Sequence, residues 1–342
     1  MHLVIAIPAL NEAQTIGEVV SAVRASFGDT PVAPTIVVVD DGSTDDTAVI
    51  AERNGAVVVR HSTNRGLANA FRTSLRFALA QKADAMVGMD ADGQFRASDI
   101  ERLIEPITSG EAEFVTGNRF EHGRPSGMPW SKYAGNRLMS ALVSRLTGLR
   151  FSDVSCGFRA YSREALLQLN VHGSFTYTQE TFLDLVEKGV AIREVPVAVT
   201  YSAERKSRIA RSLVRYGGRT LLTILRTVRD HAPLKVIGIP GALLTLFGTG
   251  GGIFVFAHYL LTGAFSPYIF VAFASAYAFT LGLGTLLAAF IADMMRAIRR
   301  NQEQVLYFLK RDQAADRPSS EGGEMQVPTA RTPVSPARER RR

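Results

Sequence analysis

The sequence predicts an α/β domain with parallel strands, followed by two membrane-spanning helices. Short apolar runs alternate with helix-like segments over residues 1–205, which is the pattern of an α/β domain. Two of these runs end in acidic clusters, beginning at Asp40 and at Asp90. Further along, no Asp, Glu, Lys or Arg occurs from Val236 to Ala292, and about 20 apolar residues suffice to cross a bilayer.

The expected strands and helices follow one another closely. The first strand, Leu3 to Ile7, leads into a helix from about Ala13 to Ser26. Four more strands are predicted because runs of β-branched and apolar residues of this length are typical of strands. They are Thr35 to Val39, Val57 to Val59, Ala85 to Met89 and Glu113 to Thr116, with helices from Ser43 or Thr44 and over about 66–82.

Carboxylates stand at the ends of two of these strands. Asp40 and Asp41 follow the second strand, and Asp90-Ala91-Asp92-Gly93-Gln94 follows the fourth. Ligands of open α/β sheets lie beyond the carboxyl ends of the strands, and oxygen ligands suit Mg²⁺ or Mn²⁺. The two clusters together predict a site for a divalent cation and a polar ligand. The alternative, that Asp and Gly only terminate strands, explains either cluster alone.

The composition is modest support for an anionic partner and does not indicate nucleic-acid binding. The formal net charge is +7 and the pI is about 9.7, but part of the excess lies in the tail 338–342. Cys156 is the only cysteine, which excludes an intramolecular disulfide and a cysteine-based metal site. The run from Leu3 to Ile7 lacks a basic n-region and a cleavage site, so we expect a strand there and a cytoplasmic catalytic part.

Residues 206–234 and 235–295 are predicted to attach the domain to a membrane. The first stretch is basic and amphipathic, so it is expected to be a helix at an anionic bilayer surface; the alternative is a solvated helix on the globular domain. The second contains two predicted spans, about 236–261 and 268–292, divided by a break at 262–267. Basic residues flank the pair only on its outer sides, which predicts that both chain ends are cytoplasmic. Residues 311–342 are expected to be disordered.

Several motifs resemble a known enzyme family. The first four resemble the family 2 glycosyltransferases of the GT-A fold, a nucleotide-sugar-binding α/β fold. They are Pro8-Ala9-Leu10-Asn11-Glu12, Val39-Asp40-Asp41-Gly42-Ser43, Asn64-Arg65-Gly66 and Asp90-Ala91-Asp92-Gly93-Gln94. Two later motifs and the two spans resemble the polyprenyl-phosphate glycosyltransferases, such as dolichol-phosphate mannose synthase. These motifs are Thr116-Gly117-Asn118-Arg119-Phe120 and Ser155-Cys156-Gly157-Phe158-Arg159. The resemblance covers residues 1 to about 300.

The resemblance implies a donor site with a metal. Asp90 and Asp92 match the family's DXD motif, whose second aspartate usually ligates the metal, and Gln94 matches a position that can approach the metal or phosphate. The implied cofactor is Mg²⁺ or Mn²⁺, which neutralises charge on the leaving diphosphate. The nucleoside ligands carried over to this chain are Pro8, Leu10, Glu12 and Asp40 or Asp41.

The resemblance also implies a cationic acceptor site. Arg119 and Arg137 fall where the family places ligands of the acceptor phosphate, and a guanidinium suits bidentate contact with phosphate. The basic segment 205–208 resembles one that precedes the membrane in the family, and which of its cations faces phosphate stays open: Arg205, Lys206 or Arg208. The expected catalytic residues are Asp92, Arg119 and Arg137.

The implied reaction is inverting transfer of a single sugar from a UDP-sugar or GDP-mannose to a polyprenyl or dolichyl phosphate. A lipid phosphate is already ionised near neutral pH, so no general base is strictly required. Orientation and charge stabilisation remain for the site to supply. Glu180 falls where the resemblance places an acidic residue near the sugar, so it is expected to contact a sugar hydroxyl or a neighbouring residue and not to act as an essential base. The alternative is a plain carboxylate at a helix N-terminus.

Two other functions remain as alternatives. A processive polysaccharide synthase would share the GT-A motifs, but those enzymes carry a Gln-x-x-Arg-Trp segment, and the only tryptophan here, Trp130, follows Gly127-Met128-Pro129. A non-catalytic membrane scaffold on a transferase fold would tend to lose the DXD motif or the arginines, and both are present. The identity of the sugar, the length of the lipid and the oligomeric state are left open.

Overall fold

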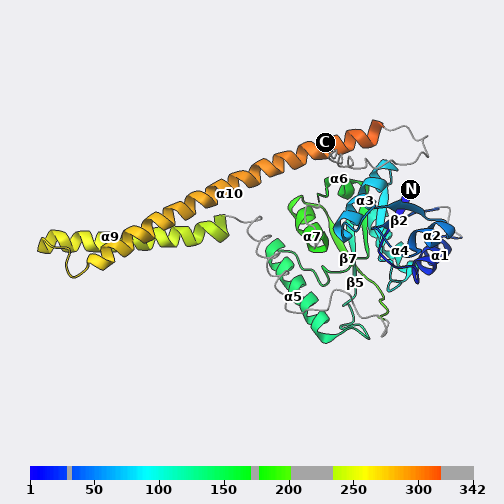
Figure 1. The fold of residues 1–342 in the computed structure, drawn as a ribbon, viewed down its shortest axis with the longest axis horizontal. Coiled ribbons are helices and arrows are strands. Elements are labelled where there is room, and N and C mark those ends of the chain that lie inside the picture. The colour runs from blue at the N-terminus through cyan, green and yellow to red at the C-terminus, as the bar shows by residue number, and fades with distance from the viewer. Residues whose placement is uncertain (29–32, 171–176, 202–233, 317–342) are drawn as a thin grey trace, which may run out of the picture.

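A computed structural model describes residues 1–28, 33–170, 177–201 and 234–316. The chain forms an α/β domain and a projecting pair of long helices (Figure 1). The α/β domain contains a seven-stranded sheet in the order β3-β2-β1-β4-β6-β5-β7. The α/β class predicted from the alternation of apolar runs and helices is confirmed.

The central strands are parallel. The strand β1 (Leu3–Ala9) pairs in parallel with β2 (Thr35–Asp40) and with β4 (Ala85–Gly88), and β2 pairs in parallel with β3 (Val57–Arg60). These four strands correspond to the first four predicted strands, within one to two residues at each end. The apolar runs of β1, β2 and β4 are buried on both faces, as expected for parallel strands covered by helices on each side. In the edge strand β3, by contrast, Val57 is exposed.

One antiparallel strand interrupts the sheet. The strand β6 (Arg159–Ser162) lies between β4 and β5 (Phe114–Asn118) and is antiparallel to both. The edge strand β7 (Ile192–Pro196) is parallel to β5. Because β4 and β5 both oppose β6, they run in the same direction, and their carboxyl ends reach the same edge of the sheet as those of β1 and β2.

Helices cover the two faces of the sheet (Figure 1). Alternate residues of β1 point to opposite faces: Leu3, Ile5 and Ile7 pack in one core cluster, and Val4 and Ala6 in the other. The first cluster includes residues of α1 (Ile16–Ser26), α2 (Thr47–Arg53) and α4 (Ile100–Thr108), which follows a 3₁₀ turn at Ala97–Asp99. The second includes residues of α3 (Leu67–Ala80), α5 (Trp130–Thr147), α6 (Arg163–Gln168) and α7 (Tyr177–Glu187).

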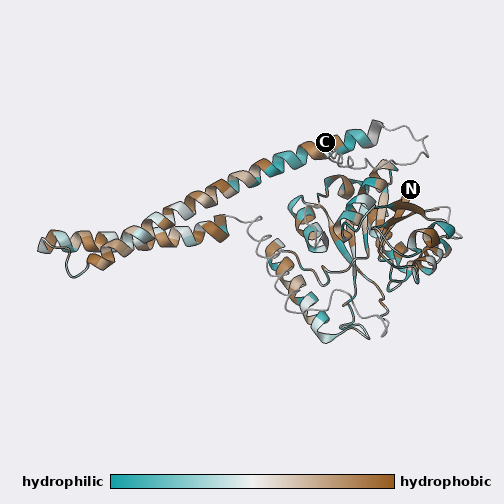
Figure 2. Ribbon diagram, in the orientation of Figure 1, coloured by the Kyte–Doolittle hydropathy of each residue, from teal (hydrophilic) through white to brown (hydrophobic). Residues whose placement is uncertain are grey.

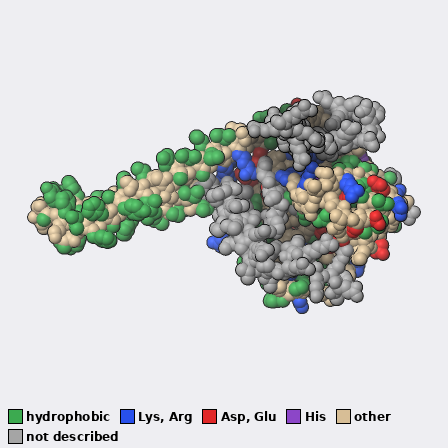
Figure 3. Space-filling view, viewed as in Figure 1, with side chains coloured by type: hydrophobic (Ala, Val, Ile, Leu, Met, Phe, Trp, Pro, Cys, Tyr) green, Lys and Arg blue, Asp and Glu red, His purple; other side chains and the backbone are tan. Residues whose placement is uncertain are grey.

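The projecting pair consists of α9 (Ile239–Thr262), which follows a π-helical turn at Leu234–Gly238, and α10 (Ile269–Asp316). Both helices are long and apolar enough to cross a membrane. Their outward side chains are largely hydrophobic in the projecting part (Figures 2 and 3). The two helices approach closely at Gly248, where a Cβ atom would collide with the backbone of Phe279.

The second apolar helix is longer than the predicted span. The helix α10 continues past residue 292 to Asp316, so it includes the first residues of the segment 311–342 that was expected to be disordered. Beyond the apolar part it becomes hydrophilic and passes beside α6 (Figures 1 and 2). The predicted amphipathic stretch 206–234 falls almost entirely outside the described residues.

Candidate active site

The loops after the first two strands are tied to each other. Asn11 has a positive φ of 53°, and its side-chain oxygen accepts a hydrogen bond of 2.8 Å from the Thr44 backbone N–H. In return, its own N–H donates to the Ser43 hydroxyl at 2.9 Å, and the Glu12 N–H donates to the Thr47 hydroxyl at 2.8 Å. These bonds bring Leu10 and Glu12 beside the turn that follows β2, and Pro8 lies within β1.

Asp41 holds a further loop in place. One carboxylate oxygen lies 2.7 Å from His61 Nδ1 and accepts a bond of 2.9 Å from the Arg65 N–H. The other oxygen accepts a bond of 2.7 Å from the Gly66 N–H. Backbone N–H groups are obligatory donors, so the carboxylate fixes the motif Asn64-Arg65-Gly66 against the end of β2.

Asp40 has a different environment. Its Oδ1 accepts a bond of 2.9 Å from the Ser43 N–H, and its Oδ2 forms an ion pair of 3.1 Å with Arg60 Nε. The Arg60 side chain is 57% exposed, whereas the Asp40 side chain is fully buried. Within the described part of the chain, Oδ2 accepts no hydrogen bond. Of the two aspartates, Asp40 is thus the one that retains acceptor capacity.

The DXD residues follow β4. Asp92 Oδ1 accepts a bond of 3.1 Å from the Gln94 N–H, and the Thr15 hydroxyl donates to the Ala91 carbonyl at 2.8 Å. Desolvation raises the pKa of Asp90 to about 6, and the charge of Asp92 adds to this, while the charge of Arg119 opposes it. Burial and the neighbouring charge of Asp92 thus both disfavour the ionised form of Asp90.

A glycine makes room for the Asp90 carboxylate. A Cβ atom at Gly157 would lie 2.8 Å from Asp90 Oδ2, which is closer than real contacts allow. The motif Ser155-Cys156-Gly157 therefore passes directly beside the DXD segment. This close approach explains why a glycine stands at position 157.

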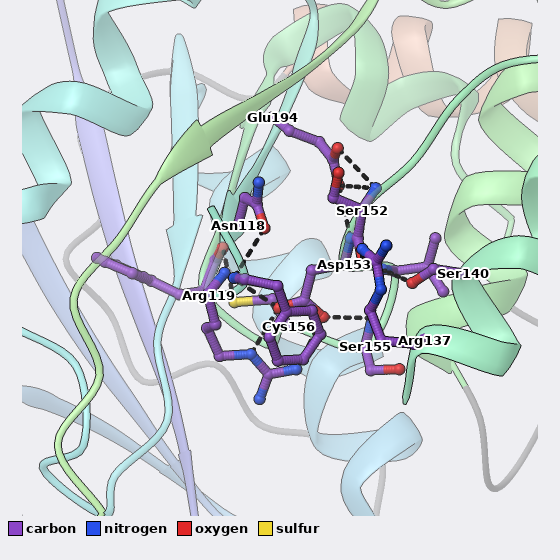
Figure 4. Close-up of polar contacts among 12 residues, drawn as sticks. Asn118, Arg119, Arg137, Ser140, Ser152, Asp153, Ser155, Cys156 and Glu194 are labelled. Carbon is purple, nitrogen blue, oxygen red and sulfur yellow. Dashed lines mark hydrogen bonds and ion pairs between the residues drawn. The ribbon is translucent and has the colours of Figure 1, made fainter. Parts of the chain in front are cut away.

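Arg119 is buried in a bidentate ion pair. Its Nε lies 2.6 Å from Asp153 Oδ2 and its Nη2 lies 2.8 Å from Asp153 Oδ1 (Figure 4). The third nitrogen, Nη1, lies 3.4 Å from the Tyr201 hydroxyl. Burial alone would lower the pKa of Arg119, but the bonds and charge of Asp153 raise it, so the guanidinium stays charged. The fork of Arg119 is thus occupied by Asp153, whereas Nη1 contacts a neutral hydroxyl.

The segment 152–157 is itself held from two sides. Glu194 of β7 accepts the backbone N–H groups of Ser152 and Asp153 at 2.8 to 3.0 Å (Figure 4). The fully buried Arg159 donates to the carbonyls of Val154 and Cys156 and to that of Thr178 at the start of α7. Asp153 therefore meets Arg119 from a loop that is fixed by hydrogen bonds at both ends.

The remaining predicted cations differ in placement. Arg137 is an exposed residue of α5 whose Nη1 lies 3.5 Å from the Ser152 carbonyl (Figure 4). The structure therefore brings Arg137 close to the loop that contains Asp153. Among the described contacts, no carboxylate pairs with the Arg137 guanidinium. Arg205, Lys206 and Arg208 lie outside the described residues. Glu180 lies in the first turn of α7.

Lys132 is a cation of this site that the sequence reasoning missed. Its Nζ lies 5.0 Å from the centre of the Tyr201 ring. Burial lowers the pKa of Lys132 and the charge of Arg119 lowers it further, while Asp92 and Asp90 oppose this. Asp153 was missed as well, since an aspartate in a loop carries no signal of its partner. Arg159 belongs to a motif that was noted, but its role in holding the loop was not visible in the sequence.

Comparison with known proteins identifies the family. The sequence model described as glycosyl transferase family 2 matches residues 4–169, which include the loops after β1, β2, β4 and β5. An uncharacterized protein of Methanocaldococcus jannaschii is 31% identical over 211 residues, which are 60% of this chain and 85% of that protein. The chain belongs to glycosyl transferase family 2. It is a glycosyltransferase.

Two named relatives match this glycosyltransferase over most of its length. Glycosyltransferase AglJ of Haloferax volcanii is 28% identical over 86% of this chain and 94% of its own. The undecaprenyl-phosphate 4-deoxy-4-formamido-L-arabinose transferase of Edwardsiella ictaluri is 27% identical over 93% of this chain and 96% of its own. Both alignments are long enough to extend beyond the catalytic domain into the apolar helices.

A solved structure supports the fold. Glucosyl-3-phosphoglycerate synthase from Mycobacterium tuberculosis in complex with UDP superposes with a TM-score of 0.52 and 24% identity, over 67% of this chain and 79% of that chain. The same protein is known in complex with Mn²⁺, UDP-glucose and phosphoglyceric acid, at a TM-score of 0.52. The glycosyltransferase described here therefore has the GT-A fold, as expected from its motifs.

The described residues of this glycosyltransferase contain no group of three or more His, Cys, Asp or Glu side chains that could enclose a metal. Asp90 and Asp92 nevertheless suit a cation that also binds substrate. Magnesium is typically bound through one or two carboxylates, with substrate phosphates and water completing its shell.

Proposed function

We propose that the protein is a membrane-bound, inverting glycosyltransferase that moves a single sugar from a nucleotide sugar, either a UDP-sugar or GDP-mannose, to a polyprenyl or dolichyl phosphate. The observation that carries this proposal is the meeting of two opposite charges at one sheet edge. The acidic pair Asp90 and Asp92 suits a cation and a diphosphate, and the loop that passes beside Asp90 at Gly157 also carries Asp153, the partner of Arg119. A donor and an anionic acceptor can therefore be bound side by side.

Relatives support a lipid phosphate as the acceptor. Besides the arabinose transferase, they include a UDP-N-acetylglucosamine–dolichyl-phosphate N-acetylglucosaminyltransferase of Methanococcus voltae and a polyprenol monophosphomannose synthase of Mycolicibacterium smegmatis. The two apolar helices of this chain would place its site near the headgroups of such a lipid. We propose that both chain ends and the catalytic domain are cytoplasmic, following the distribution of basic residues around the spans.

On the donor side, the proposed nucleoside site is formed by the tied loops of Pro8, Leu10 and Glu12 with Asp40. The contacts of Asp41 support an indirect role in donor binding, because its carboxylate accepts hydrogen bonds from the backbone N–H groups of Arg65 and Gly66. The proposed metal ligands are Asp90, Asp92 and Gln94. A bound Mg²⁺ or Mn²⁺ would supply charge neutralisation at the leaving diphosphate.

On the acceptor side, the proposed phosphate ligands are Arg119 through Nη1 and Arg137, with Arg205, Lys206 and Arg208 as further candidates. The phosphate oxygen forms a bond to the anomeric carbon as the bond from that carbon to the nucleoside diphosphate breaks. Because the attacking oxygen is already ionised, no protein side chain needs to remove a proton. The protein orients the two anions and balances their charge.

The proposal is tested with membranes that contain the protein, a panel of labelled sugar nucleotides, and polyprenyl phosphate. Label from one donor should pass into the chloroform–methanol phase as a single sugar on a lipid that mild acid releases. The donor that labels the lipid identifies the sugar and the nucleotide. A water-soluble polymer would instead favour a processive polysaccharide synthase, and the absence of transfer from every donor would favour a non-catalytic scaffold.

A further inference from the structure

The part of α10 beyond its apolar stretch lies against the catalytic domain. Its less exposed residues are Arg296, Glu303, Tyr307 and Lys310, spaced by seven, four and three positions. This spacing places them on one face of a helix. We call residues 296–310 the docked segment. It begins only a few residues after Ala292, the last residue of the charge-free run.

Lys310 joins the far end of the docked segment to α6. Its Nζ donates to the carbonyls of Leu167 at 3.3 Å and Leu169 at 2.9 Å, and to Asn170 Oδ1 at 2.8 Å. Carbonyls at the end of a helix have no partner within the helix and are favourable sites for a cation. Burial lowers the pKa of Lys310 to about 8, and the charge of Lys188 adds to this. Three oxygens compensate this partly desolvated ammonium.

Tyr307 supports the same contact. Its ring packs against the core cluster formed by residues of α3, α6 and α7. Its hydroxyl lies 3.4 Å from Glu164 Oε2 in the first turn of α6. The docked segment therefore contacts both ends of α6, with polar and apolar groups.

The near end of the docked segment contacts α7. Arg296 Nη2 lies 2.7 Å from Glu187 Oε1, and Lys188 Nζ lies 3.3 Å from Glu303 Oε2. At its opposite end, α7 contributes the Thr178 carbonyl that accepts a bond from Arg159. The helix α7 therefore contacts the docked segment at one end, and at the other end it contacts Arg159, which holds the loop that contains Asp153.

These contacts restrict how the catalytic domain can be oriented. The docked segment is about 21 Å long at 1.5 Å per residue, and it is anchored at both ends and in the middle. A single continuous helix links it to the membrane span. The catalytic domain is therefore attached to a span through a rigid element.

We propose that the docked segment is a positioning element that orients the acceptor side of the active site toward the bilayer, and that it thereby makes transfer selective for acceptors anchored in the membrane. The inference rests on the proposed function for its acceptor. It predicts a property that simple stabilisation of the fold does not produce. Loss of docking should weaken transfer to a membrane-embedded acceptor and spare transfer to a soluble one.

The experiment uses the full-length protein in lipid nanodiscs. Transfer is measured to a long-chain polyprenyl phosphate in the bilayer and to a short, water-soluble isoprenyl phosphate. The test variant is Lys310→Met combined with Tyr307→Ala. The matched control is Arg300→Met, on the exposed side of α10, and the conservative variant is Lys310→Arg. Spin labels at Glu111→Cys and Gln304→Cys, both exposed, report the distance between the catalytic domain and the docked segment.

In the test variant, we expect the ratio of kcat/KM for long-chain over short-chain acceptor to fall by about tenfold or more, because the advantage of a fixed geometry near the bilayer is lost. The affinity for the nucleoside diphosphate of the donor should not change, and the distance distribution between the labels should broaden. The control and the conservative variant should behave as the wild type does.

An unchanged ratio, or an equal loss with both acceptors, would overturn the inference. If the wild type transfers sugar to neither acceptor, the proposed function fails, and the spin-label distances still decide whether the segment docks. A narrow distribution that is the same in the test variant and in the wild type would then refute docking through Lys310 and Tyr307.

Discussion

Arg119 and Asp153 form a bidentate ion pair, although 34 positions separate them in the sequence. The Arg119 side chain is 8% exposed and that of Asp153 is fully buried. Removing one partner of a buried pair leaves an uncompensated charge, whereas removing both is much less damaging. This asymmetry allows the structural role of Arg119 to be separated from a role in binding phosphate.

We expect Arg119→Ala to impair transfer in two ways. Loss of a charge-assisted contact to phosphate should cost on the order of 1.5–3 kcal/mol, roughly 10- to 150-fold in kcat/KM for the acceptor, with little effect on donor affinity. The unpaired Asp153 should lower the free energy of unfolding by about 3–5 kcal/mol. Acceptor titrations and unfolding in detergent measure the two effects.

The double variant Arg119→Ala with Asp153→Ala is the matched control for this prediction. It should recover much of the lost stability, because no buried charge is left unpaired, but it should not recover transfer. If transfer returned together with stability, Arg119 would act only by maintaining the fold of the site.

Asp92→Ala should abolish transfer and leave the fold intact, because the side chain is at the proposed cation site and lies outside the core clusters. Wild-type activity should also vanish with EDTA and return with Mn²⁺ or Mg²⁺. The measurements are label transfer to lipid and thermal unfolding of both proteins. Full activity in thoroughly chelated membranes would show that the transfer does not use a metal.

Asp90→Asn should stabilise the metal-free protein near neutral pH. The folded-state pKa of Asp90, about 6, lies above the ordinary value of 3.8. The carboxyl therefore contributes stability that is fully present below about pH 4 and is lost as the pH rises through about 6. Removing the charge should restore on the order of 1–3 kcal/mol at neutral pH.

The check for Asp90 is thermal unfolding with EDTA from acid to neutral pH, with Glu111→Gln as a control at an exposed carboxylate. The difference between Asp90→Asn and wild type should grow as the pH rises and should shrink when Mn²⁺ is added, since metal binding favours the ionised carboxylate. A variant that unfolds at a lower temperature than wild type at neutral pH contradicts the proposed repulsion.

Asp41→Ala should destabilise the protein, whereas Asp40→Ala should mainly weaken the donor site. Asp41 accepts two backbone N–H bonds and contacts the buried His61, and the loss of a hydrogen bond to a charged group costs about 1.5–3 kcal/mol. Thermal unfolding and titrations with the nucleoside diphosphate of the donor are compared, with the exposed Asp46→Ala as the control. An unchanged unfolding temperature in Asp41→Ala would show that the loop 64–66 does not depend on this carboxylate.

Features that depend on local pattern could be predicted from the amino-acid sequence alone. Apolar runs located the strands β1 to β5 to within a few residues, and the acidic clusters marked two strand ends at the site. The absence of charge from Val236 to Ala292 located the two apolar helices. In each case the signal lies within one contiguous segment, because strand burial, turns and membrane partition depend on neighbouring residues.

Contacts between groups that are distant in the sequence became known only from the folded chain. It inserted β6 antiparallel between β4 and β5, paired Arg119 with Asp153, and distinguished Asp41, which holds a loop, from Asp40. It also extended α10 past its apolar part and docked it on α6 and α7. These features depend on packing between segments far apart in the chain, and the charge of an arginine or lysine does not indicate whether its partner is solvent, substrate or a carboxylate in another loop.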